Sequence, residues 1–207
     1  MLSHKSAAAL AVAIGLSTSV YAQSSEVVRN ASFVFNGIEK TIRQAATLDA
    51  GQVASFLKPA DDCAPLCLTP VSYSDAIPTV GEADVITFLG QQVASGQGLL
   101  IDSRMPDARG LGFISGSVNV PHALVSAENP YLADIMQALG ARSFDGMLNF
   151  TDALPLVIFD DGPSTTDAPQ LITALLGAGY PSDKISYYRG GMLVWTALGL
   201  NTEDASS

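Results

Sequence analysis

The chain has 207 residues, of which 48% are hydrophobic, and carries a formal net charge of −10 at pH 7. This length and composition suffice for one domain with a hydrophobic core plus a smaller appendage. Such an acidic chain repels phosphate backbones, which argues against nucleic acid as a partner, and acidity of this size otherwise serves solubility.

The N-terminus contains one long apolar run, SAAALAVAIGLSTSVYA, which follows Lys5 and ends in the triplet VYA at 20–22. A basic start, a short apolar stretch and small residues are typical of a secretory signal. We therefore expect residues 1–22 to be removed and the protein to be periplasmic or secreted, beginning at Gln23. The alternative is a membrane anchor, but a spanning helix needs about 20 apolar residues. We do not expect the mature chain to be embedded in a membrane.

Residues 23–78 are predicted to form a hairpin followed by an irregular arm. Residues 32–42 alternate between apolar and polar around Asn36 and Gly37, which is the strongest short signal for a β-hairpin. Residues 43–78 lose this periodicity and contain four prolines.

The two cysteines of the chain, Cys63 and Cys67, lie in this arm. In an exported chain an isolated pair is first interpreted as a disulfide, although a bridge across so small a loop contributes only about 2 kcal/mol. A redox-active or sulfur-carrying dithiol, or free thiols, are the alternatives. The spacing differs from C-x2-C, and no helix start is evident there to lower a thiol pKa.

From Thr79 onward, helical and apolar segments alternate. Thr79 and Glu82 form a T-x-x-E pattern that predicts a capping box. The expected elements are helices over 82–95, 129–141 and 166–178, a short helix within 189–200, and strands at 99–102, 118–120, 154–159 and 184–188. Such alternation favours a parallel sheet with helices on both faces. In these sheets ligands bind at the carboxyl ends of strands, where Asp102, Asp160 and Arg189 are expected.

Four segments of this region resemble the rhodanese-like family, in the family's own order. They are LLIDSR, GFISGSVNVP, LVIFDDGPSTTDAPQLITALLGAGY and ISYYRGGMLVWTALGL. The resemblance implies a five-stranded parallel α/β domain over residues 79–201, preceded by the hairpin and the arm, and leaves 202–207 as a flexible tail.

The resemblance also implies a chemistry, in which a cysteine after the active-site strand carries sulfur as a persulfide. The backbone N–H groups of the following loop stabilise the sulfur anion at a helix N-terminus. Here Asp160 stands at the position of that cysteine. The loop after it consists of Asp161, Gly162, Pro163, Ser164 and Thr165.

A carboxylate cannot form a persulfide, and its charge repels thiosulfate. We therefore expect Asp160 to accept the loop N–H groups itself, as a built-in ligand of the anion cradle. The resulting prediction is a homologue inactive as a sulfurtransferase, which needs no cofactor and acts as a binding or regulatory module for an unknown protein partner or a small anion.

Two more specific roles for the acidic loop have less support in the sequence. A phosphotransfer site of the haloacid-dehalogenase type needs Asp-x-Asp, whereas Asp160 and Asp161 are adjacent, so that their side chains diverge. A Ca2+ or Mg2+ site that also uses Asp167 has suitable oxygen ligands, but the amide cradle opposes a cation. We expect no metal.

Four residues outside the loop have two interpretations each. Asp102 and Arg104 form either an internal ion pair that orients the strand end or a pair that contacts a ligand. Arg189 offers a positive group to an anion or is a paired surface arginine. His122 is interpreted as a surface or capping residue rather than a catalytic base.

The alternative function is enzymatic. Cys63 or Cys67 would then carry the persulfide, brought to the cradle by the arm, or the two would form a thiol redox couple. Free thiols in the mature protein would favour this alternative.

Overall fold

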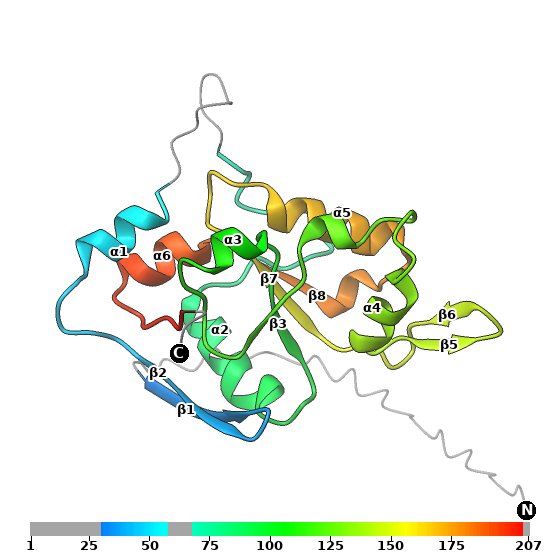
Figure 1. Cartoon of the computed structure of the whole chain (residues 1–207), viewed down its shortest axis with the longest axis horizontal. Coiled ribbons are helices and arrows are strands. Elements are labelled where there is room, and N and C mark those ends of the chain that lie inside the picture. The colour runs from blue at the N-terminus through cyan, green and yellow to red at the C-terminus, as the bar shows by residue number, and fades with distance from the viewer. Residues whose placement is uncertain (1–29, 58–67, 205–207) are drawn as a thin grey trace, which may run out of the picture.

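A computed structural model describes residues 30–57 and 68–204 of the chain (Figure 1). Its centre is a parallel sheet in the order β4–β3–β7–β8. These strands span Ser117–Asn119 (β4), Leu99–Asp102 (β3), Leu156–Phe159 (β7) and Ile185–Tyr188 (β8). Continuous apolar runs form the central strands because both faces of the sheet are covered.

The register of the sheet places three strand ends level with one another. Asp102 pairs with Phe159, and Phe159 pairs with Tyr188. The residues that follow β3, β7 and β8 therefore emerge at one edge. This is the edge at which the sequence places the candidate site residues.

The α/β fold predicted from the sequence is confirmed, but the sheet has four strands among the described residues. The expected fifth strand is a single parallel bridge between Thr79 and Tyr187. Val80 donates to the carbonyl of Tyr187 at 2.9 Å, and Tyr187 donates to that of Pro78 at 2.8 Å. Pro78 has no N–H to extend the ladder, so the pairing ends there.

Helices cover both faces of the sheet, as expected. On one face lie α4 (Leu132–Ala138) and α5 (Asp167–Gly177), and on the other lie α2 (Glu82–Phe88), its π-helical continuation η1 (Leu89–Val93) and α6 (Gly191–Ala197). The short helices are α3 (Pro106–Arg109), η2 (His122–Leu124) and η3 (Ser182–Lys184). Each face has its own core, and Trp195 of α6 is fully buried in the second.

Two predictions at helix starts need correction. The capping box at Thr79 is wrong, because α2 begins at Glu82 and the side chain of Asp84 accepts the N–H of Gly81 at 2.9 Å. The hydroxyl of Thr79 donates instead to the carbonyl of Val71. The helix predicted over 129–141 is shorter and begins at Leu132.

The N-terminal hairpin is confirmed as β1 (Asn30–Phe35) paired with β2 (Ile38–Arg43). Asn36 and Gly37 both have positive φ, 50° and 78°, as a two-residue hairpin turn requires. The arm that follows is not wholly irregular, since it contains α1 (Ala50–Ser55). Asp49 caps this helix through the N–H groups of Gly51 and Gln52.

A second hairpin was not predicted. It consists of β5 (Arg142–Phe144) and β6 (Met147–Asn149), joined by Asp145 and Gly146. Figure 1 shows that it projects from the body of the domain.

Residues 202–204, which the sequence assigns to a tail, include a residue that contacts the domain. Glu203 forms an antiparallel bridge with Phe113. Its carboxylate accepts from Lys40 of β2 at 2.7 Å and from Ser115 at 2.7 Å. The C-terminal segment thus fastens the hairpin to the domain.

The predicted signal segment 1–22, Cys63 and Cys67 lie outside the described residues. Within 30–57 and 68–204, no helix has the length and apolar character needed to cross a membrane.

The sharpest test of this architecture is Gly191, at the start of α6. Its φ is +57°, and a Cβ there would meet the carbonyl oxygen of Asp160 and lie 2.6 Å from the N atom of Gly162. We expect Gly191→Ala to lower the free energy of unfolding by at least about 2 kcal/mol through strain and overpacking, measured by urea titration. Gly177→Ala, in open space, is the control and stays neutral or stabilises by up to about 1 kcal/mol. Equal values for the two variants would refute the close packing.

Candidate functional site

The structure brings together the residues that the sequence places at the carboxyl edge. Asp102 is the last residue of β3, Asp160 directly follows β7 and Arg189 directly follows β8. Arg104 and the loop 161–165 lie at the same edge.

Asp102 and Arg104 form the internal ion pair, and both side chains are fully buried. The guanidinium donates Nε to Oδ1 of Asp102 at 2.9 Å and Nη2 to Oδ2 at 2.7 Å. Its Nη1 donates to Oδ1 of Asp161 at 2.9 Å. Burial lowers the pKa of Arg104, but the hydrogen bonds and charges of the two carboxylates raise it above its usual value. Removing one partner of a buried pair of this kind lowers the free energy of unfolding by about 3–5 kcal/mol.

Arg109 on α3 completes the network and was not singled out in the sequence. It donates to Oδ2 of Asp102 at 2.9 Å and to the hydroxyl and carbonyl of Ser117 on β4. Its guanidinium also lies 3.8 Å from the centre of the Phe113 ring. A single arginine after a strand carries no sequence signal for this role. Its partners become clear only once β3 and β4 are paired.

Asp160 lies in the cradle formed by the loop and the start of α5, and its side chain is fully buried. Its Oδ1 accepts the N–H of Gly162 at 3.0 Å, and its Oδ2 accepts the N–H of Ala168, in the first turn of α5, at 3.0 Å. The carboxyl group thus spans the two ends of the loop. Two amide groups of the cradle are therefore already used by a residue of the chain itself.

Two opposing effects act on this carboxyl group. Burial raises the pKa of Asp160 to about 7, while hydrogen bonds from Ala168, Thr165 and Gly162 lower it and the charge of Asp167 raises it further. Desolvation therefore outweighs the stabilisation by the amide groups. Asp160 changes its charge near neutral pH.

The loop has a defined conformation. Gly162 has a φ of +145°, a region that favours glycine. Thr165 closes the loop by donating its N–H at 3.0 Å and its hydroxyl at 2.9 Å to the carbonyl of Gly162. Pro163 and Ser164 lie at its partly buried outer side. Asp161 points away from Asp160 towards Arg104, in agreement with the expected divergence.

Arg189 is a paired residue in the structure. Its Nε and Nη2 donate to the carbonyl oxygen of Thr69 at 3.0 and 2.7 Å. Thr69 in turn donates its N–H to the carbonyl of Pro163 in the loop at 2.7 Å. Sequence reasoning missed Thr69, because the contact joins residues 120 positions apart.

His122 begins η2 beside α5, and its half-buried side chain, 27% exposed, fits the expected surface position only in part. Its Nδ1 is 3.3 Å from Oδ1 of Asp167. Within the described part of the chain, no group of three or more His, Cys, Asp or Glu side chains is arranged to hold a metal ion.

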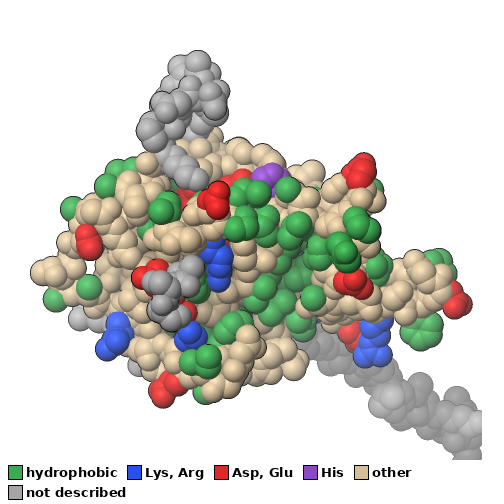
Figure 2. All heavy atoms as spheres, viewed as in Figure 1, with side chains coloured by type: hydrophobic (Ala, Val, Ile, Leu, Met, Phe, Trp, Pro, Cys, Tyr) green, Lys and Arg blue, Asp and Glu red, His purple; other side chains and the backbone are tan. Residues whose placement is uncertain are grey.

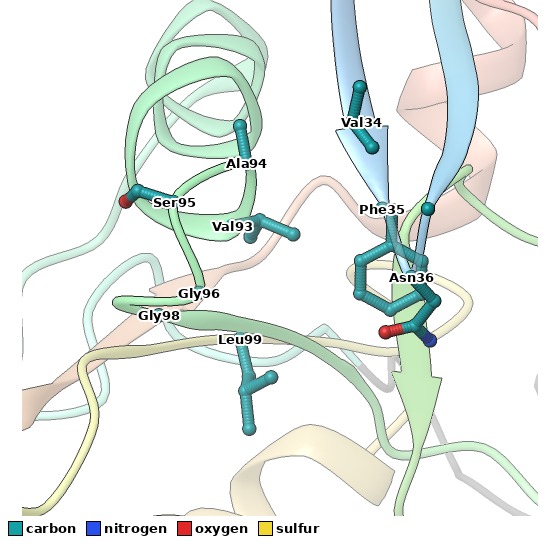
Figure 3. Close-up of a pocket in the computed structure, with 10 residues that line it drawn as sticks. Val34, Phe35, Asn36, Val93, Ala94, Ser95, Gly96, Gly98 and Leu99 are labelled. Carbon is teal, nitrogen blue, oxygen red and sulfur yellow. The ribbon is translucent and has the colours of Figure 1, made fainter.

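Two hollows among the described residues lie at different places in the fold, and one of them adjoins this edge. A pocket of about 340 Å³ lies between β1 and the end of η1, with Val34, Phe35, Val93 and Leu99 in its lining (Figure 3). Leu99 is the first residue of β3, so this pocket is at the opposite edge of the sheet. A cleft of about 250 Å³ borders the cradle edge and is lined by Thr69, Pro70, Ser72, Tyr73, Pro169 and Tyr187.

Charge is dispersed rather than concentrated on the face shown in Figure 2. Acidic side chains there are scattered among other types. This face offers no single acidic patch, which is compatible with a general role of the acidity in solubility.

Comparisons with known proteins give one family. The profile of the rhodanese-like domain matches residues 87–198, more than half of the chain. No curated protein matches.

Similar solved structures include three bacterial proteins. A Bacillus halodurans protein is 13% identical and covers 61% of this chain and 77% of its own, with a TM-score of 0.46. A Rhodopseudomonas palustris protein of unknown function, named a possible tyrosine phosphatase, is 18% identical over 77% and 98%, with a TM-score of 0.46. The rhodanese-like domain of an Anabaena protein is 21% identical over 61% and 79%, with a TM-score of 0.40.

The raised pKa of Asp160 predicts how stability depends on pH. Because the folded state keeps this proton up to about pH 7 and the unfolded chain releases it near pH ~3.9, stability falls as pH rises between these values. At about 1.4 kcal/mol per pKa unit, this contribution is a few kcal/mol. Asp160→Asn removes it, so we expect a flatter stability curve from pH 4 to 8 in urea titrations.

Asp145→Asn is the matched control, because Asp145 is exposed in a hairpin turn that asparagine also favours. Its curve should follow that of the unmutated protein. If the stability curves of Asp160→Asn and the unmutated protein ran parallel, the raised pKa of the buried Asp160 would be contradicted.

Proposed function

Because the chain belongs to the rhodanese-like domain family, we propose that it is a sulfurtransferase homologue that has lost sulfur transfer and acts as a binding or regulatory module. One observation carries this proposal. Asp160 stands where the resemblance places the nucleophilic cysteine, and its two oxygens occupy the amide groups of Gly162 and Ala168.

The chemistry of the carboxyl group supports loss of transfer. Sulfur transfer needs a thiolate, which is both nucleophilic and able to hold a second sulfur atom. The chain has two cysteines, and both precede residue 68. An ionised Asp160 also opposes a second anion in the same cradle.

The surroundings of the loop support a binding role. The loop conformation, the buried Arg104 network and the contact with α6 remain in place without the nucleophile. A protein partner or a small anion therefore still meets a defined edge, and the titration of Asp160 near pH 7 couples the charge of that edge to pH.

The test is thiocyanate formation from thiosulfate and cyanide, in which the outer sulfur of thiosulfate passes to cyanide and sulfite is released. We expect no turnover from the unmutated protein, before or after reduction. Asp160→Cys supplies a thiolate to an intact cradle, so its rate should exceed that of the unmutated protein by at least roughly tenfold.

Variants of the two cysteines distinguish this proposal from the alternative, in which Cys63 or Cys67 carries the sulfur. Cys63→Ser and Cys67→Ser should have no effect on this assay. Turnover by the unmutated chain that disappears in either variant would overturn the proposal and place the active sulfur in the arm.

We further propose that the protein is exported to the periplasm or secreted. The support is the composition of residues 1–22, and the test is the mass of the protein recovered from its native host. Cleavage before Gln23 is the expected result, whereas a mass that retains residues 1–22 would contradict it.

A further inference from the structure

Residues 68–71 cross the cradle edge, and we call them the strap. The strap precedes the region matched by the family profile, which begins at residue 87. It therefore lies outside the range that the family profile matches.

One strap residue makes four hydrogen bonds to that edge. The N–H and hydroxyl of Thr69 donate to the carbonyl of Pro163 at 2.7 and 3.1 Å. Its carbonyl accepts Nε and Nη2 of Arg189 at 3.0 and 2.7 Å. The strap thus joins the loop after β7 to the residue after β8.

The contacts also reach the buried side of the site. The hydroxyl of Thr69 lies 3.5 Å from that of Tyr187, a side chain whose pKa is raised mainly by burial and also by the charge of Asp160. Further along, Val71 accepts from Thr79 at 2.9 Å, and Tyr73 contacts Thr173 of α5 at 2.8 Å. Val71 thus ties the strap to Thr79, and Tyr73, just beyond the strap, contacts α5.

Arg189 is the cation that follows β8 directly at this edge. Two of its donor atoms are used by a backbone carbonyl, which carries no full charge. A small oxyanion accepts the same two donors with a charge-assisted bond, which is stronger than a neutral one. An oxyanion is therefore the ligand class that competes with the strap.

We propose that the strap closes the site from outside, and that its release exposes the cradle and frees Arg189 for a small oxyanion such as sulfate. This rests on the proposed function, since it concerns the regulation of the same site. Asp160 closes the cradle from within, and the strap is a second, separable closure.

The experiment measures access to the cradle with a buried thiol. In a chain carrying Cys63→Ser, Cys67→Ser and Asp160→Cys, the introduced thiol is the only one. Its alkylation by iodoacetamide reports the fraction of molecules in which the site is open. Two variants release the strap: Thr69→Pro removes both donors to Pro163, and Arg189→Lys keeps the charge but loses the two-pronged contact.

We expect either release to speed alkylation roughly three- to tenfold, since this is the change in an equilibrium constant for one or two ordinary hydrogen bonds. Ser72→Ala, at an exposed neighbour of the strap, is the control and should react at the parent rate. Sulfate should speed alkylation of the parent and lose this effect in an Arg189→Met chain.

Equal alkylation rates in the parent and both release variants would overturn the proposal. If a variant fails to fold, hydrogen exchange of the unmutated protein tests instead whether the strap closes the site. The Thr69 N–H should be protected, and exchange at the rate of an unstructured peptide would overturn the closure. The proposed function fails separately, through thiocyanate formation by the unmutated chain, which leaves these measurements unaffected.

Discussion

The buried guanidinium of Arg104 is the constraint on which the edge of the sheet depends. A fully buried cation is tolerated only when carboxylates and carbonyls surround it. Asp102 supplies a two-pronged partner from β3, Asp161 supplies a second charge from the loop, and the carbonyl of Gly112 accepts at 2.8 Å. Because Asp161 is drawn towards this cation, its neighbour Asp160 faces the opposite way, into the amide groups of the loop. One charge network thus fixes both the strand end and the content of the cradle.

The two adjacent carboxyl groups, Asp160 and Asp161, are chemically identical but have different partners. Asp161 is paired with a guanidinium, whereas Asp160 has only amide and hydroxyl donors. Amide groups at a helix start stabilise an anion by roughly 0.3–1 kcal/mol, and this does not repay the cost of burying the charge. The prediction of an ionised Asp160 is therefore incomplete, because burial raises the pKa of this carboxyl to about 7. The same cradle that suits a polarisable sulfur anion is therefore an imperfect site for a carboxylate.

Sequence patterns predicted those parts of the structure that depend on near neighbours. Apolar runs gave the central strands, and Asn36 with Gly37 gave the first hairpin. Asp145 with Gly146 carries the same hairpin signal, but its strands are three residues long and exposed, so hydrophobic alternation did not mark them. The prediction of a capping box at Thr79 failed for two reasons. Two acidic residues follow Thr79, and its hydroxyl donates to the carbonyl of Val71 instead. Partners of Arg109 and Thr69 lie on other strands or far along the chain, where local patterns carry no information.

Parts of the N-terminal arm and the C-terminal segment contact the domain directly. Residues 87–198 alone contain Arg189 and the loop, but the contacts that cover them come from Thr69, outside this range. In the same way, Glu203 joins Lys40 of the hairpin to Ser115 of the domain. Successive backbone amides form a concavity suited to an anion, and in this chain Asp160 accepts two of them. Asp160, inside the matched range, fills the cradle from within, whereas Thr69, outside it, contacts the same edge from the arm.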